Sequence, residues 1–342
     1  MKNNKIDVVV TWVNGKDPAW LKERSKYLSL KESNSEKYFR DWDTLRYLFR
    51  GFEKFMPWIN KIHFVTWGHL PYWMNTDSEK LHIVKHSDFF ENTNHLPVFN
   101  SNSIEANLHL IPNLSDMFIY FNDDMLVLKP IKIERYFQDG KPLDFIHQSI
   151  PRKGFLYKLI RSNEVFVDIM NNEYKYLNSS FSKRELLKRE PTLFYSKDYP
   201  IKWIIMNFIF NTISSKYLWL NIYHHPQPYL KRTLIEAHHL YKQVFEETST
   251  HKFRSKTDVC QYLYRKIQLA NGDFYPYEPK DTYFLNISSI KMLIKNTDKI
   301  KKSSLFCAND HASLTNQEFE IAKNELTKIL DSILPFKSSF EL

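Results

Sequence analysis

Short apolar runs that end in polar residues recur along the chain. They are rich in β-branched and aromatic side chains, and runs of this length and composition are typical of buried strands. We therefore expect strands at IDVVVTWV (6–13), IHFVTW (62–67), LHIVK (81–85), MFIYF (117–121), MLVL (125–128), YLWLNIY (217–223), DTYFLNI (281–287) and SLFCAN (304–309).

Between these runs, apolar residues recur every three or four positions, which is typical of amphipathic helices. The pattern is clear at 40–58 and in the last helix, where Thr315 and Glu318 have the spacing of a capping box. Strands that alternate with helices predict an α/β fold built on an open sheet. We expect a nucleotide-binding half at 1–150, a helical insertion at 151–216 and the remainder of the core at 217–342.

Charge and composition narrow the class of partner. Lys and Arg exceed Asp and Glu by 48 − 39 = 9, so an anionic partner is favoured. The basic residues are spread out, so no nucleic-acid tract is indicated. Two cysteines give no disulfide framework, and no signal-peptide pattern opens the chain. We expect a soluble cytoplasmic protein whose basic residues leave room for peripheral contact with the inner face of the membrane.

The stretch Asp116–Pro130 carries the strongest candidate chemistry. Asn122, Asp123 and Asp124 separate two apolar runs. Carboxylates at the end of a buried strand are a common way to hold Mg²⁺ against a phosphate-bearing substrate. A plain strand-to-strand turn accounts for the same residues, because Asn and Asp favour turns.

Other strand-like runs also stop at polar residues. Asn14 and Gly15 follow the first run, His224 follows the run at 217–223, and Asn309-Asp310 end the run at 304–309. Two prolines after His224 indicate a loop rather than a continuing central strand. Asp7, inside the first strand, is either a ligand-facing group or a solvent-side strand residue.

Three arginines and one glutamate each have two possible roles. Arg40, Arg46 and Arg50 either bind phosphate or pair with carboxylates on a helix face. Glu105 lies three residues after Asn102, as in a capping box, and Thr257 or Asp258 has the place of a helix cap. Carboxylates for Mg²⁺, arginines for phosphate and a histidine for proton transfer together indicate phosphoryl chemistry on a nucleotide-activated donor.

Four blocks of this sequence resemble the Stealth family of hexose-1-phosphate transferases, which includes bacterial capsule polysaccharide phosphotransferases. They cover nearly the whole chain except its tails. The blocks are IDVVVTWVNGKDP at 6–18; RDWDTLRYLFR, LPVFNSNSIE and FIYFNDD within 40–124; HHPQPYLK and HKFRSKTDV within 224–259; and SLFCAND at 304–310.

The resemblance implies a nucleotide-sugar-binding core of glycosyltransferase (GT-A-like) type that depends on Mg²⁺ or Mn²⁺. It implies transfer of sugar-1-phosphate from a UDP-sugar donor to an oligosaccharide or lipid-linked glycan acceptor, with release of UMP. Mapped onto this sequence, the resemblance assigns catalysis to His224, Arg254, Asp124 and Arg46. The expected metal ligands are Asp123, Asp124, Asn309 and Asp310. Expected donor-binding residues are Asp7, Thr11, Trp12, Asn14, Gly15, Arg40, Asp41, Ser101 and Glu105.

Two rival functions fit the same residues. A conventional metal-dependent glycosyltransferase would use the same donor site and release UDP instead of UMP. A carbohydrate-binding module is suggested by the 16% of aromatic residues, because sugars stack on aromatic faces.

Overall fold

The computed structural model describes residues 5–28, 40–153, 157, 165–311 and 313–342. Its centre is a five-stranded sheet in the order β3-β2-β1-β4-β8. Strands β1 to β4 are parallel, and β8 runs antiparallel to β4. The carboxyl ends of four strands and the amino end of β8 therefore lie at one edge. The strands are β1 (Ile6–Thr11), β2 (Ile62–Thr66), β3 (Leu81–Lys85), β4 (Met117–Asn122) and β8 (Gln227–Leu230).

The central strands are buried on both faces, which explains their unbroken apolar runs. Val8 and Val10 of β1 enter one hydrophobic core, whereas Val9 enters the other. Strand β4 alternates in the same way, with Ile119 in the first core and Tyr120 in the second. The expected α/β fold with an open sheet is confirmed.

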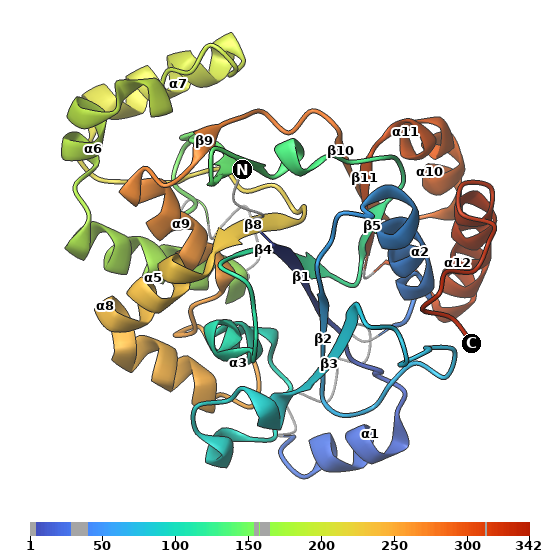
Figure 1. Cartoon of the computed structure of the whole chain (residues 1–342). Coiled ribbons are helices and arrows are strands. Elements are labelled where there is room, and N and C mark those ends of the chain that lie inside the picture. The colour runs from blue at the N-terminus through green and yellow to red at the C-terminus, as the bar shows by residue number, and fades with distance from the viewer. Residues whose placement is uncertain (1–4, 29–39, 154–156, 158–164, 312) are drawn as a thin grey trace.

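Helices cover both faces of the sheet (Figure 1). The first core is closed by α2 (Leu45–Phe55), α10 (Ile290–Lys295), α11 (Thr297–Lys302) and α12 (Asn316–Asp331). The second core is closed by α3 (Ser101–Glu105), α5 (Val165–Ser180), α6 (Lys183–Arg189), α8 (Lys231–Thr250) and α9 (Gln261–Asn271). Helices α1 (Pro18–Ser25) and α7 (Ile201–Ile213) lie at the periphery.

Two small sheets extend this frame. In one, β11 (Leu305–Asp310) pairs with β10 (Thr282–Ile287) in parallel and with β5 (Met125–Val127) in antiparallel orientation. In the other, the strands are β6 (Phe137–Gln138), β7 (Lys141–Asp144) and β9 (Tyr275–Pro276). The strands expected at 281–287 and 304–309 are thus confirmed.

Helix α2 and strand β5 touch through their backbones. A Cβ added to Gly51 of α2 would lie 2.5 Å from the carbonyl oxygen of Val127. No side chain fits at that distance, so glycine is required for this approach.

Two local predictions have opposite outcomes. The capping box of Thr315 and Glu318 is present and begins α12. The strand expected at 217–223 is wrong, because the strand lies at 227–230 instead and its Pro228 pairs with Ile119. Strand β8 lies at the edge of the sheet. A proline is tolerated there, because no further strand needs the N–H group that proline lacks.

The region 151–216 is helical where the structure describes it, through α5, α6 and α7. Residues 158–164, part of the expected insertion, lie outside the described residues. Val167 of α5 and Leu186 of α6 share the second core with the central sheet. The domain boundaries at 150/151 and 216/217 stay a prediction.

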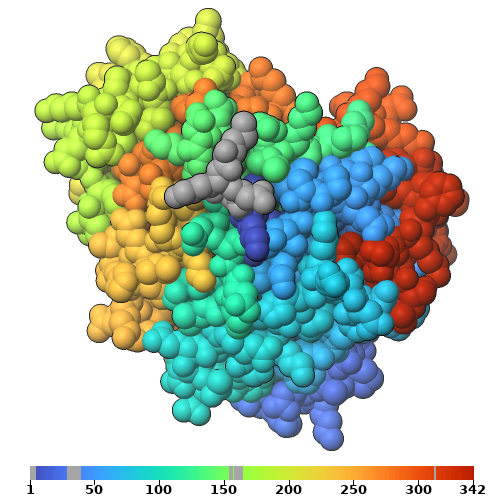
Figure 2. Space-filling view, in the orientation of Figure 1, coloured from blue at the N-terminus to red at the C-terminus, as the bar shows by residue number. Residues whose placement is uncertain are grey.

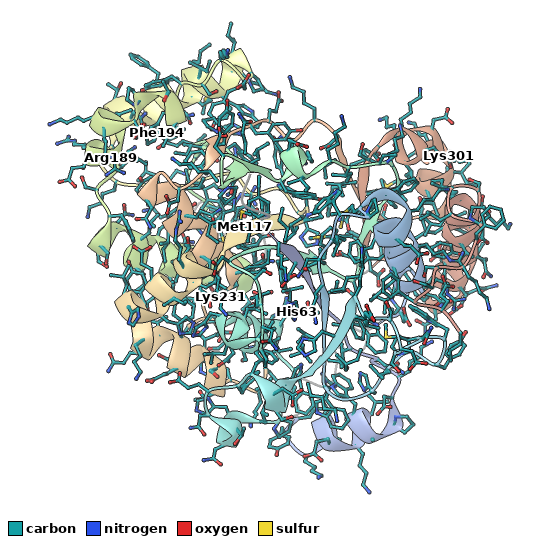
Figure 3. The ribbon with its side chains drawn as sticks, in the orientation of Figure 1. His63, Met117, Arg189, Phe194, Lys231 and Lys301 are labelled. Atoms are coloured by element: carbon teal, nitrogen blue, oxygen red, sulfur yellow. The ribbon has the colours of Figure 1, made fainter. Side chains whose placement is uncertain are left out.

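Asp7 is a structural residue, which corrects its expected role in donor binding. It lies near the amino end of β1, away from the carboxyl edge, and is completely buried. Its carboxylate is 3.0 Å from His63 Nε2, and it accepts hydrogen bonds from Asn60 Nδ2 and the Ser115 amide. Figure 3 labels His63 in the interior of the molecule. The carboxylate has no surface left for a ligand.

Replacing Asp7 with alanine should lower the free energy of unfolding by about 3–5 kcal/mol at neutral pH, because it leaves the buried His63 and the donors of Asn60, Lys61 and Ser115 without their acceptor. Burial opposes ionisation, but the hydrogen bonds from His63, Asn60 and Ser115 hold the pKa of Asp7 below its usual value. Its stabilising contribution is therefore present above the unfolded pKa, near 4, and is lost as the pH falls through the lower folded value. Urea unfolding at several pH values measures the difference in free energy of unfolding between the variant and the wild type, with exposed Asp77→Ala as the control. A difference that does not change with pH would contradict the prediction.

Candidate active site at the carboxyl edge of the sheet

A turn of two residues, Asp123 and Asp124, joins the central sheet to the sheet of β5. Strand β4 ends at Asn122 and β5 begins at Met125. The carbonyl oxygen of Asp124 accepts a hydrogen bond from the amide of Ala308 in β11, at 3.0 Å. Asp124 is thereby held where the two sheets meet.

The Asp124 carboxylate contacts two groups through one oxygen. Its Oδ2 lies 3.1 Å from His224 Nε2 and accepts a hydrogen bond from the Cys307 thiol at 3.2 Å. A carboxylate can only accept, so we assign the proton to Nε2 of the imidazole. Its Oδ1 is buried and has no hydrogen-bond partner in the described part of the chain. An unpaired buried carboxylate oxygen is costly and therefore indicates a missing ligand.

Neighbouring groups set the charge states around Asp124. Burial alone would lower the pKa of His224, but the Asp124 carboxylate outweighs that effect and raises it. Burial raises the pKa of the Cys307 thiol well above its usual range, so the thiol stays protonated and acts as a donor. Burial also raises the pKa of Asp123 to about 7, and the charges of Asp124 and Asp41 add to that rise.

Glu105 belongs to a buried hydrogen-bond chain, so its expected role as a helix cap is wrong. The cap of α3 is Asn100, whose side chain accepts from the amide of Asn102. Glu105 instead accepts from the Tyr120 hydroxyl at 3.1 Å and from the amide of Gln261, at the start of α9, at 2.9 Å.

The series of hydrogen bonds around Glu105 extends to the end of β1, where the Thr11 hydroxyl lies 3.0 Å from the Tyr120 hydroxyl. Burial raises the pKa of Glu105 to about 7, although the Gln261 amide and the charge of Arg254 oppose the rise. Thr11, Tyr120 and Glu105 therefore form one continuous polar network beneath the sheet edge.

Arg254 is exposed and donates a hydrogen bond to the Ser101 hydroxyl at 2.9 Å. Its loop is held by Asp258, which is fully buried and accepts from the side chains of Asn100 and Asn102 and from the amide of Ser255. Asp258 is therefore a loop anchor rather than the helix cap expected from the sequence, because the cap of α9 is Cys260.

Strand β11 places Asn309 and Asp310 on opposite faces. Side chains alternate along a strand, so Asn309 shares the face of Cys307, which contacts Asp124. Asp310 instead forms a two-pronged ion pair with Arg40, with contacts of 2.8 and 2.9 Å. Any metal binding by Asp310 would require this ion pair to open, and its expected role as a ligand stays a prediction.

Arg46 and Arg50, both on α2, also have carboxylate partners. Arg46 pairs with Asp43 at 3.0 Å, and Arg50 pairs with Glu341 at 2.8 Å. The structure does not bring either guanidinium to Asp124 by any contact among the described residues. The pair of Arg46 with Asp43 agrees in part with the solvated pairing that the sequence left open, whereas Arg50 is buried and pairs with a residue near the end of the chain.

The loop after β1 lies at the same edge of the sheet. Trp12 is buried, stacks on Phe64 and meets His69 edge-on. The Asn14 amide donates to His69 Nε2 at 2.8 Å, and Gly15 follows it in the chain. The expected donor contacts of Trp12, Asn14 and Gly15 stay predictions.

The donor atoms at this edge fit a hard divalent cation. Mg²⁺ and Mn²⁺ prefer oxygen ligands, and the free Oδ1 of Asp124 provides one. Asp123 and Asn309 are the neighbouring residues able to add carboxylate and amide oxygens. Asp124, His224 and Cys307 also have ligand atoms within 4.8 Å of one another. That group by itself has the ligand types of a Zn²⁺ site, and the thiol of Cys307 would have to lose its proton to bind such an ion.

Two residues of this site were missed by sequence reasoning. Cys307 lies two positions before Asn309, and strand alternation alone would have placed both on one face. Tyr120 lies inside the apolar run of β4, and a buried tyrosine hydroxyl usually requires a partner. Both signals were present in the sequence.

Conserved-region models of one family match along this chain. The Stealth protein models match residues 4–32 for conserved region 1, residues 38–144 for conserved region 2 and residues 223–260 for conserved region 3. These ranges contain Thr11, Ser101, Glu105, Asp124, His224 and Arg254.

Relatives of similar length match over nearly the whole chain. The capsular polysaccharide phosphotransferase WcwK of Streptococcus pneumoniae is 34% identical and covers 100% of this chain and 99% of its own. The receptor polysaccharide phosphotransferase WefC of Streptococcus gordonii is 35% identical, covering 99% of each chain. The exopolysaccharide phosphotransferase cps2G of Lactiplantibacillus plantarum is 30% identical, covering 98% and 96%.

Among solved structures, the galactosyltransferase LgtC in complex with donor and acceptor sugar analogues aligns over 96% of each chain. The identity is 12% and the TM-score is 0.40. The match of three conserved regions and the full-length identity to polysaccharide phosphotransferases show that the chain belongs to the Stealth family.

Proposed function

We propose that this protein transfers sugar-1-phosphate from a UDP-sugar to a hydroxyl group of a glycan and releases UMP. The names of its relatives support sugar-phosphate transfer in polysaccharide synthesis. The observation that carries the proposal is the contact between His224 and Asp124, made beside a carboxylate oxygen that lacks a partner. The proposed base and the proposed cation site are thus joined by the side chain of Asp124, which contacts His224 through one oxygen and leaves the other oxygen for the cation.

His224 is the proposed general base. With the Nε2 proton directed to Asp124, its Nδ1 carries the lone pair that accepts a proton from the acceptor hydroxyl. The acceptor oxygen then forms a bond to the β-phosphorus of the donor. The bond from that phosphorus to the bridging oxygen breaks, and the electron pair leaves with UMP. The product is a phosphodiester between the two sugars.

Arg254 is the proposed phosphate-binding residue, because it is exposed while Arg40, Arg46 and Arg50 are each held by a carboxylate. Its hydrogen bond to Ser101 directs the guanidinium toward the edge that carries Glu105. A planar guanidinium can contact two phosphate oxygens at once.

Asp124, Asp123 and Asn309 would hold Mg²⁺ or Mn²⁺. When bound, the ion would neutralise the charge of the donor diphosphate. The protein groups around it have separate tasks: Ala308 fixes the backbone of Asp124, and His224 and Cys307 orient its carboxylate.

Identifying the released nucleotide tests the reaction. Incubation with a panel of UDP-sugars, a divalent cation and a glycan acceptor should yield UMP, and phosphorus NMR of the glycan should show a phosphodiester. Release of UDP with no phosphorus in the product would establish a conventional glycosyltransferase instead. Absence of cation-dependent turnover across the panel would favour a binding module.

Replacing His224 with alanine should lower kcat by about 10²–10⁴-fold, the usual contribution of a general base, and leave UDP-sugar binding within about twofold. Turnover and calorimetric binding measure the two effects separately. His239→Ala, on the exposed side of α8, is the matched control. Unchanged turnover would remove His224 from the mechanism.

Asp124→Asn should weaken Mn²⁺ binding by at least about tenfold, because it removes the charge next to the unpaired oxygen. Electron paramagnetic resonance of free Mn²⁺, recorded with UDP present, measures the affinity without relying on turnover. Asp310→Asn should leave this affinity nearly unchanged and lower thermal stability, because Asp310 is held by Arg40. Equal loss of Mn²⁺ binding in both variants would instead make Asp310 a ligand.

A further inference from the structure

Helix α7 exposes a largely apolar face. Residues 201, 202, 205, 208, 209, 212 and 213 fall on one side of a helix with 3.6 residues per turn, and Lys202 and Thr212 are the polar residues among them. A single exposed isoleucine needs no explanation, but a continuous apolar stripe marks an interaction surface. The exposed fractions are 76% for Ile201, 53% for Ile205, 62% for Phe208, 43% for Ile209 and 65% for Ile213.

The opposite face of α7 is pinned to the protein, so the apolar stripe is held outward. Trp203 and Phe210 are buried, and Trp203 packs on Phe145. Asn207 is fully buried, donates to the carbonyl oxygens of Ile146 and Phe194 and accepts from the amide of Gln148. These directional bonds prevent the helix from rolling to hide its outer face.

Helices α6 and α7 project from one corner of the molecule. In Figure 2 the corresponding yellow-green segment forms a knob on the upper left, and Figure 3 labels Arg189 and Phe194 within it. A convex ridge of this kind fits a plane better than it fits a groove. Thirteen residues correspond to a helix roughly 20 Å long.

Basic residues surround the apolar face. Between residues 181 and 216 the chain has seven Lys or Arg and three Asp or Glu, so this segment carries 7 − 3 = +4. Lys197, Lys202 and Lys216 are exposed next to or within α7. An apolar stripe flanked by lysines has the chemistry of a helix that lies in the interface of an anionic bilayer.

We propose that α7 is a membrane-docking helix, which inserts its apolar face into the interface of an anionic lipid bilayer while the flanking lysines contact the headgroups. In the part of the chain that the structure describes, no helix has the length and apolarity needed to cross a bilayer.

The docking helix is connected by packing to the proposed base. Trp203 of α7 meets the ring of Tyr223 at 6.1 Å, and Tyr223 directly precedes His224. Membrane contact at α7 would thus bring the loop that carries His224 close to the lipid surface. The consequence, which rests on the proposed function, is that the acceptor is a glycan attached to a lipid.

Vesicle sedimentation tests the docking surface without any substrate. The full chain should bind vesicles of phosphatidylcholine with phosphatidylglycerol more tightly than vesicles of phosphatidylcholine alone, and salt should weaken the difference. The pair Ile205→Ser and Phe208→Ser should reduce binding to the anionic vesicles by roughly tenfold or more. The pair Ile209→Ser and Ile213→Ser provides an independent second test.

The matched control is Ile294→Ser with Ile321→Ser, two exposed isoleucines on α10 and α12, far from α7 in Figure 1. This control should bind vesicles like the wild type. All variants should retain transfer to a soluble acceptor, which separates a docking defect from a failure of the proposed reaction.

Unchanged vesicle binding in both α7 pairs, or no binding by the wild type, would overturn the proposal. Analytical ultracentrifugation identifies the competing occupant. A wild-type dimer that becomes a monomer on substitution, without vesicle binding, would assign the face to a second copy of this chain.

Discussion

The site depends on one covalent constraint: two residues, Asp123 and Asp124, are all that connect a strand of the central sheet to a strand of the second sheet. Both strands are buried, so neither can shift without disturbing a close-packed core. The hydrogen bond from Ala308 adds a third fixed point. Asp124 is consequently held in place by both sheets, and groups fixed in this way are what electrostatic preorganisation requires.

Around this turn, acidic groups outnumber the cations that contact them. Asp123, Asp124 and Glu105 lie in partly or fully buried surroundings, and burial is the first cause of the raised pKa of both Asp123 and Glu105. Two neighbouring residues oppose these rises, because Arg254 lowers the pKa of Glu105 and His224 lowers the pKa of Asp123. An oxygen left without a partner beside these groups is the expected signature of a site completed by a cation and a diphosphate.

Sequence patterns predicted the elements whose signals are local. The runs at 6–13 and 117–121 gave strands because burial on both faces requires continuous apolar residues, and the capping box at Thr315 marked the start of α12. Strand β8 was misplaced because its four residues, which include Pro228, pair only as an edge strand of β4, a partner that no local pattern reveals.

Sequence patterns also predicted one part of the candidate site and not another. The positions of Thr11 and Asp124 followed from strand ends, since parallel strands bring those ends together. His224 reaches the same edge for a different reason, because it precedes the amino end of the antiparallel strand β8. The partners of Glu105 and Asp310 did not follow, because helix spacing accounted for the first, and the second pairs with an arginine 270 residues away. Contacts over such separations are decided by tertiary packing, which also assigned Asp258 to a loop instead of a helix cap.

The contact between Gly51 and Val127 fixes the position of the turn that carries Asp124. Backbone lies against backbone with no compressible side chain between them, so α2 and β5 form one closely packed unit. Arg254 lies on an irregular loop that is held by the hydrogen bonds of Asp258, by the hydrogen bond from the Phe99 amide to the carbonyl oxygen of Lys252 and by stacking of Phe99 on Phe253. The candidate cation ligand and the candidate phosphate-binding arginine are therefore supported independently, the first by packed backbone and the second by a hydrogen-bonded loop.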